Sequence, residues 1–209
     1  MKKILIALAF LASTGWASPT VSASQASVAD GPVMVFPVPA GVVGETLVVF
    51  VATEDRVGNK DAEAWNPGWS AKTTGIAPYG LLRLVKVSDG SEASVTVNMA
   101  GNGAAIALRV SGAGSVQQHE IRAHGTAGVL SDPPTAYTRS GVQDSLVIAV
   151  TANAQGVALI PAGYGFPVNA AGAINLTVSF RSVVASSENP GPYSLNVAET
   201  STAASALVY

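Results

Sequence analysis

The chain has 209 residues, of which 48% are hydrophobic and only 11% are charged, and its formal net charge is -2. This length suits one domain of ordinary size or two closely packed halves, and a nearly neutral chain lacks the positive field that binds nucleic acid, so we expect no nucleic-acid partner. We expect other subunits to cover part of a surface so poor in charge, and the absence of cysteine excludes disulfides and thiol chemistry.

The amino terminus has the outline of a secretory signal. Two lysines precede an apolar run at residues 4–11, and small residues follow that offer cleavage sites after Ala17 or after Ala23. The run is too short for a membrane span, which needs about 20 residues. We therefore predict a signal-peptide-like leader at residues 1–17, with a packed N-terminal arm as the alternative, and no stable membrane span in the mature form.

The segments after the leader have the patterns of β-strands. Residues 47–51 and 146–150 are apolar on both faces, which indicates central strands covered on both sides. Residues 94–99 and 193–197 alternate between polar and apolar side chains, as strands with one wet face do. Turn residues separate these segments, and no window of a dozen residues past the leader keeps a helical period. The pattern predicts an all-β sandwich or barrel.

Four segments recur in the same order about a hundred residues later. Leu47 aligns with Leu146 and Trp69 with Tyr164, while SVTV and AAIALRV align with SLNV and AASALVY. An ordered set of matches indicates an internal duplication. Because each half has a face that it cannot bury alone, we expect the halves to pack together about a pseudo-two-fold axis, with each aligned pair superposed.

These patterns predict an all-β fold: a jelly-roll-like β-sandwich built from two duplicated half-domains with pseudo-two-fold symmetry. We expect the first half-domain at residues 18–111 and the second at residues 141–209. A linker is expected between them, at residues 112–140.

Several turn and core motifs also occur together along the chain. They are the apolar strand at residues 39–53, a Pro-Gly-Trp turn, KVSDGSE, SVTVNM, AAIALRVSG and a DPP linker. Together these motifs resemble a duplicated β-sandwich of phage structural proteins, particularly tail and minor tail proteins. The resemblance covers nearly everything after Ser18 and implies a virion component, such as a tail, fibre or head-surface protein, that binds other virion proteins and copies of itself.

The leader departs from that pattern, because most virion proteins assemble in the cytoplasm. It keeps an alternative open, which is an exported bacterial β-sandwich module for glycan binding or surface adhesion. The expected location is accordingly the virion, with secretion or the cell surface as the alternative.

Motifs of catalytic and metal sites are missing from the sequence. His119 and His124 fall on opposite faces of a predicted strand, so they cannot jointly bind a metal. No Gly-x-Ser-x-Gly elbow, Walker motif or dinucleotide glycine pattern occurs. We therefore expect no enzymatic activity, no metal and no cofactor.

The loop at residues 54–67 differs most between the two halves. It is longer than its counterpart and concentrates charges beside Trp65, whereas the counterpart has none. Loops carry recognition when the fold does not require them, and aromatic side chains beside polar groups bind sugars and other partners. The predicted contact surface, toward a neighbouring subunit or a host-surface glycan, consists of Asp55, Arg56, Lys60, Asp61, Glu63 and Trp65. Buried packing is the alternative for Trp65 and the expectation for Trp69.

Overall fold

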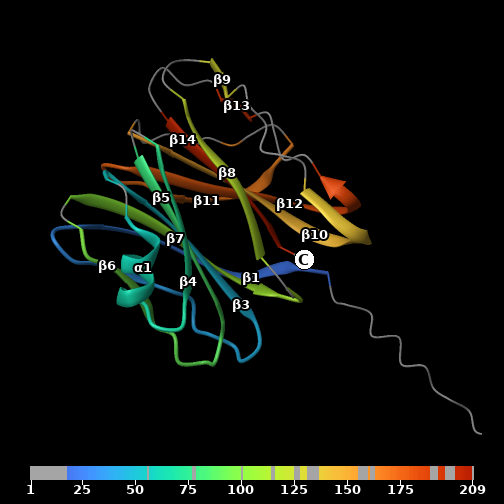
Figure 1. Cartoon of the computed structure of the whole chain (residues 1–209), viewed down its shortest axis with the longest axis horizontal. Coiled ribbons are helices and arrows are strands. Elements are labelled where there is room, and N and C mark those ends of the chain that lie inside the picture. Colours follow the sequence, from blue (N-terminus) through green and yellow to red (C-terminus); the bar gives the residue numbers. More distant parts are fainter. Residues whose placement is uncertain are drawn as a thin grey trace, which may run out of the picture.

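The computed structural model contains two antiparallel five-stranded sheets, two small two-stranded sheets and a short helix (Figure 1). It describes residues 18–55, 57–76, 79–99, 101–113, 116–124, 128–130, 137–154, 160, 163–188, 193–195 and 201–208. The predicted all-β sandwich is confirmed. The leader predicted at residues 1–17 lies outside the described residues.

The first sheet has the strand order β1-β7-β3-β5-β4. Its strands are β1 (Thr20–Asp30), β3 (Thr46–Thr53), β4 (Ser70–Ile76), β5 (Tyr79–Val87) and β7 (Asn102–Ser111). Strand β3 is central, and each of its side chains is buried. It was predicted as a central strand because both of its faces are apolar, and a strand covered on both sides requires this. A small sheet of β2 (Met34–Pro37) and β6 (Ser94–Val97) lies beside the first sheet.

The second sheet has the strand order β11-β12-β10-β14-β8. Its strands are β8 (Val116–His124), β10 (Tyr137–Asn153), β11 (Gly165–Ala170), β12 (Asn175–Glu188) and β14 (Ser201–Val208), and β9 (Gly128–Leu130) pairs with β13 (Tyr193–Leu195) in the other small sheet. The segment at residues 112–140 was expected to be a linker. It contributes β8, β9 and the start of β10 to this half.

The two large sheets have their strands in the same spatial order. Strands β8, β14, β10, β12 and β11 stand in the same order as β1, β7, β3, β5 and β4, and β9 pairs with β13 as β2 pairs with β6. Edge strand β1 lies against β11, and edge strand β4 lies against β8. This arrangement is what the predicted duplication requires, and the duplication itself stays a prediction.

One core lies between the two sheets. Val48 and Phe50 of β3 meet Ile148 of β10 and Leu176 of β12 there. Phe50 is only 3% exposed. Apolar faces of both halves are therefore buried against each other, as expected from a sandwich in which neither half can cover its own face.

A second core lies on the outer side of the first sheet. Leu47 and Val49 of β3 pack there against Met34 and Phe36 of β2 and against helix α1 (Asn59–Trp65). We call this cluster the outer core. Leu146 instead belongs to the core between the sheets, so the predicted residue-by-residue superposition of Leu47 on Leu146 is wrong.

Candidate interaction site at helix α1

Helix α1 occupies most of the segment that was predicted to be a loop at residues 54–67. Its seven residues are too few to form a stable helix alone, so tertiary packing must hold it. Ala62 is fully buried, and Trp65, one turn later, is half-buried; both pack on the outer core. The loop prediction failed because this helix is shorter than any window that shows a helical period.

Two side chains of α1 bond to the backbone of strand β4. Glu63 Oε1 accepts a hydrogen bond from the N–H of Ala71 at 2.9 Å, and Asn59 Oδ1 accepts bonds from the N–H and the hydroxyl of Thr73. Strand β4 is an edge strand, and Ala71 and Thr73 have the alternate N–H groups that face away from β5. The helix therefore covers a sheet edge that would otherwise offer unpaired donors.

A buried asparagine fixes the carboxyl end of the helix. Asn66 Nδ2 donates to the carbonyls of Ala62 and Thr96, each at 2.8 Å, and its Oδ1 accepts from the N–H of Thr96 at 2.7 Å. Thr96 belongs to β6, so Asn66 connects the helix to the small sheet as Asn59 and Glu63 connect it to β4. The helix is held on two sides.

The five predicted site residues that the structure describes divide into two groups. Asp55, Lys60, Asp61 and Glu63 are exposed, and three of these four lie on α1. Trp65 is half-buried against the outer core, so the packing alternative applies to part of its side chain. Arg56 lies outside the described residues. Whether these residues form a contact surface stays a prediction.

Trp69 is buried, as expected from the sequence. Trp69 is 8% exposed and belongs to the outer core. Its sequence partner Tyr164 packs against Val147 on the second sheet, and the guanidinium of Arg181 lies 4.8 Å from the centre of the Tyr164 ring. Trp69 precedes β4 as Tyr164 precedes β11.

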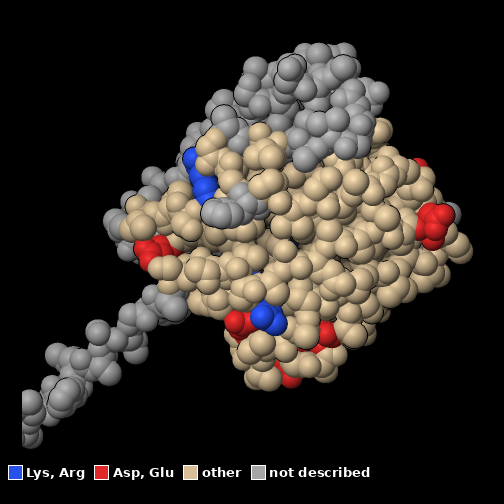
Figure 2. All heavy atoms as spheres, turned by 180° about the vertical axis from the view of Figure 1, so that it is seen from behind, with Lys and Arg blue, Asp and Glu red and all other residues tan. Residues whose placement is uncertain are grey.

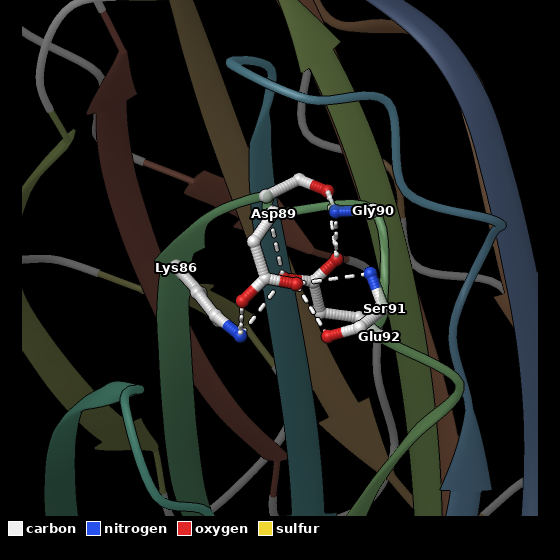
Figure 3. Close-up of polar contacts among 6 residues, drawn as sticks. Lys86, Asp89, Gly90, Ser91 and Glu92 are labelled. Atoms are coloured by element: carbon white, nitrogen blue, oxygen red, sulfur yellow. Dashed lines mark hydrogen bonds and ion pairs between the residues drawn. The ribbon is translucent and has the colours of Figure 1, made fainter.

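A charged cluster that the sequence reasoning did not treat as a site closes the turn between β5 and β6 (Figure 3). Lys86 Nζ lies 2.8 Å from Asp89 Oδ2 and 2.9 Å from Glu92 Oε1. Glu92 also accepts bonds from the Ser88 hydroxyl at 2.7 Å and from the N–H groups of Asp89 and Gly90. We call these residues the turn cluster. Its signal in the sequence is KVSDGSE, an Asp-Gly turn with a lysine before it and a glutamate after it.

The contacts in the turn cluster favour the charged form of each group. Burial by itself raises the pKa of Glu92, whose side chain is 2% exposed, but bonds from the Asp89 N–H, Lys86 and Ser88 lower it to about 2. The bond from Lys86 lowers the pKa of Asp89, and Asp89 followed by Glu92 raises the pKa of Lys86. Each group is therefore charged across the neutral range.

The turn cluster supports the neighbouring turn between β2 and β3. A Cβ atom at Gly41 would overlap Ser88 Oγ and Glu92 Oε2, so a larger residue here would displace these two side chains of the cluster. The backbone N–H of Gly44 donates to the Ser88 carbonyl at 2.9 Å, and the N–H of Ser88 donates to the Glu45 carbonyl at 2.8 Å. The cluster thus has a structural role, which is to hold two turns together at one end of the sheet.

The rest of the described surface offers few charges, as the face in Figure 2 shows. Among the described residues, no three His, Asp or Glu side chains are placed to hold a metal ion together. None of the described helices is long and apolar enough to cross a membrane.

Comparison of the chain with protein-family models, with curated proteins and with solved structures found no match. The likeness to phage structural proteins therefore stays an expectation from the sequence motifs.

Proposed function

We propose that this chain is a non-enzymatic structural and interaction subunit of a phage virion, in a tail, fibre or head-surface position. In this proposal it binds other virion proteins and copies of itself, and the outer surface of α1 contacts a neighbouring subunit or a host-surface glycan. The observation that carries the proposal is the fixed placement of α1, which leaves Lys60 and Asp61 exposed on a chain with only 11% charged residues.

The way in which α1 is held supports a recognition role. Asn59, Glu63 and Asn66 bond to two different strands, so the exposed side chains start from a fixed backbone. Such preorganisation lowers the entropy lost when a partner binds. Charges of both signs next to each other favour one orientation of a partner over others, which gives specificity more than affinity.

The corresponding sequence of the second half supports the same assignment. Residues 154–163 contain no charged residue, although they follow the equivalent central strand β10. Charged residues that are present after the central strand of one half and absent after that of the other are not required by the shared arrangement of strands. They are therefore available for contact with a partner.

The test removes two of the exposed charges, one of each sign, and leaves the core intact. The variant Asp55→Ala/Lys60→Ala is compared with Lys72→Ala/Asp89→Ala, which removes one basic and one acidic side chain from exposed positions elsewhere in the first half, away from β1. Trp65 is left unchanged because it packs on the outer core, so its loss would also destabilise the fold. We expect the first variant to co-sediment less with assembled particles, or to attach less to host cells, while the control behaves as wild type.

Two results would contradict the proposal. If wild-type protein never co-sediments with particles and is instead recovered from the medium or the cell surface, the exported adhesion module is the better assignment. If the Asp55/Lys60 variant remains folded and assembles and attaches like wild type, Asp55 and Lys60 do not belong to a contact surface.

A further inference from the structure

The edges of the two large sheets differ in how they are protected. Edge strand β4 is covered by the side chains of α1. Edge strand β11 contains Pro167 and an irregular register between Gly165 and Val168, and β8 contains Glu120 and Arg122 in its sequence. A covering element, a proline, a bulge and charged residues are the devices by which proteins prevent edge-to-edge pairing.

Edge strand β1 has few of these devices. It pairs with β7 on one side, and no described strand pairs with its other side. It is the longest strand of the first sheet, it contains no proline, and Asp30 at its very end is its only charged residue. Its one bulge lies near its start, between Val21 and Ala23, and from Ala23 onward the register with β7 is regular.

Apart from Gln25, the side chains of β1 are small or of medium size, and no residue of the strand is fully buried. They alternate between exposed and half-buried along the whole strand, so neither face of β1 is completely covered by the protein itself. Three of the exposed large hydrophobic residues lie in or beside this region: Val28 on β1 is 50% exposed, and Val33 directly before β2 and Val35 on β2 are each 54% exposed. Strand β2 lies next to β1. The edge of β1 with which no described strand pairs thus has apolar side chains beside it, and it lies next to β2 and against β11 of the second sheet.

We infer that β1 is a self-association edge, at which β1 of a second copy of this chain adds in antiparallel orientation and joins two first sheets into one continuous sheet. The inference rests on the proposed function in so far as it names the surface through which copies of the subunit bind each other. Main-chain hydrogen bonds supply the attraction, as they do when a strand is added to a sheet edge. The exposed valines add apolar area.

The charges of β1 favour a second copy in antiparallel orientation. A two-fold axis near Gln25 places the two uncharged Gln25 residues at the axis, Ser24 opposite Ala26, and the two Asp30 residues at opposite ends. With about 3.4 Å per residue, these carboxylates are then roughly 34 Å apart. Parallel pairing in register would instead place them side by side, where like charges destabilise a sheet. The same strand therefore fits its own copy without a charge conflict.

The test places lysines on the edge. Ser24 and Ala26 are exposed residues near the middle of β1, and Ser24→Lys/Ala26→Lys brings like charges together across the two-fold axis. The control is Ala93→Lys/Ser94→Lys, which makes the same exchanges at exposed positions outside β1. In sedimentation velocity over a wide concentration series, we expect wild type and control to form dimers and the edge variant to associate about tenfold more weakly or not at all.

Hydrogen exchange provides a readout that needs no mutation. In wild type, the amides of β1 are expected to exchange more slowly as the protein concentration rises, while those of β4 are unaffected. The inference is overturned if wild type stays monomeric, if a folded edge variant associates as strongly as wild type, or if dimers form without slower exchange in β1. A monomer that still co-sediments with particles overturns this inference and leaves standing the proposed binding to other virion proteins.

Discussion

Leu47 and Leu146 lie on the central strands of their sheets but face opposite cores. Leu47 of β3 packs in the outer core, whereas Leu146 of β10 packs between the sheets beside Ile148. Successive side chains of a strand point to opposite faces, so a shift of one residue moves a side chain from one face to the other. The sequence alignment pairs Leu47 with Leu146 because the two residues are identical. The side-chain directions in the structure instead require an alignment of the two strands that is shifted by one residue.

The position of Phe50 leads to the first prediction. Phe50 faces the core between the sheets and is 3% exposed, so Phe50→Ala should lower the free energy of unfolding by about 3 to 5 kcal/mol, because it loses buried area and leaves a cavity. Urea melts measure this change. Val87→Ala is the control, since Val87 is 64% exposed and its truncation should stay within about 0.5 kcal/mol. A loss below about 1 kcal/mol for Phe50→Ala would show that the two sheets do not pack through this residue.

The central strands could be predicted from the sequence, but the register between the halves could not. Residues 47–51 and 146–150 are apolar on both faces, and this pattern identifies a strand that is covered on both sides. The same pattern removes the alternation that shows which residues face which core. Strand identity was therefore available from the sequence, whereas side-chain direction depended on contacts with β2, α1 and the second sheet.

The candidate site could likewise be predicted only in part from the sequence. The charge and length of residues 54–67 marked the segment as unusual. The helix was not predictable because its stability comes from Ala62 and Trp65 packing on the outer core and from side-chain bonds to β4. The turn cluster was easier to predict from the sequence, because its charged residues lie within seven consecutive positions, 86–92.

A second prediction concerns the cover of β4. Asn59→Ala/Glu63→Ala removes the acceptors of the Ala71 and Thr73 N–H groups, and each lost bond should cost about 1 kcal/mol. The uncovered edge should also promote association at high concentration. Thermal melts and light scattering measure the two effects. Lys60→Ala changes an exposed residue of the same helix and should show neither, and a double variant as stable and as dispersed as this control would mean that α1 does not protect the edge.

A third prediction concerns acid. The folded state lowers the pKa of Glu92 from 4.5 to about 2, so its contribution to stability is present above about pH 4.5 and is lost as the pH falls toward 2. The pKa of Lys86 is raised above 10.5, so its contribution is present below that pH and is lost only as the pH rises beyond it. The turn cluster should therefore contribute constant stability between about pH 5 and 10.

The variant Glu92→Gln tests this account of acid sensitivity. It should lose about 1 to 2 kcal/mol at pH 7, because charge-assisted hydrogen bonds are replaced by weaker neutral ones, and the difference from wild type should shrink as the pH falls from 4.5 toward 2. Urea melts at a series of pH values measure both quantities. Asp30→Asn neutralises an exposed carboxylate outside the cluster and is the control. A difference between Glu92→Gln and wild type that is the same at pH 3 and pH 7 would contradict the assignment.

The last prediction concerns processing of the leader, and the structure distinguishes the two cleavage sites. Ala23 lies inside β1, so cleavage after it would remove the start of that strand, including Val21, which packs against the core between the sheets. Cleavage after Ala17 leaves all of β1 in place. We therefore expect a mature protein that begins at Ser18 when the chain is expressed in a host with an active export pathway. Intact-mass analysis measures the start of the chain; a product that begins at Met1 would support the packed-arm alternative, and one that begins at Ser24 would mean that β1 does not need its first residues.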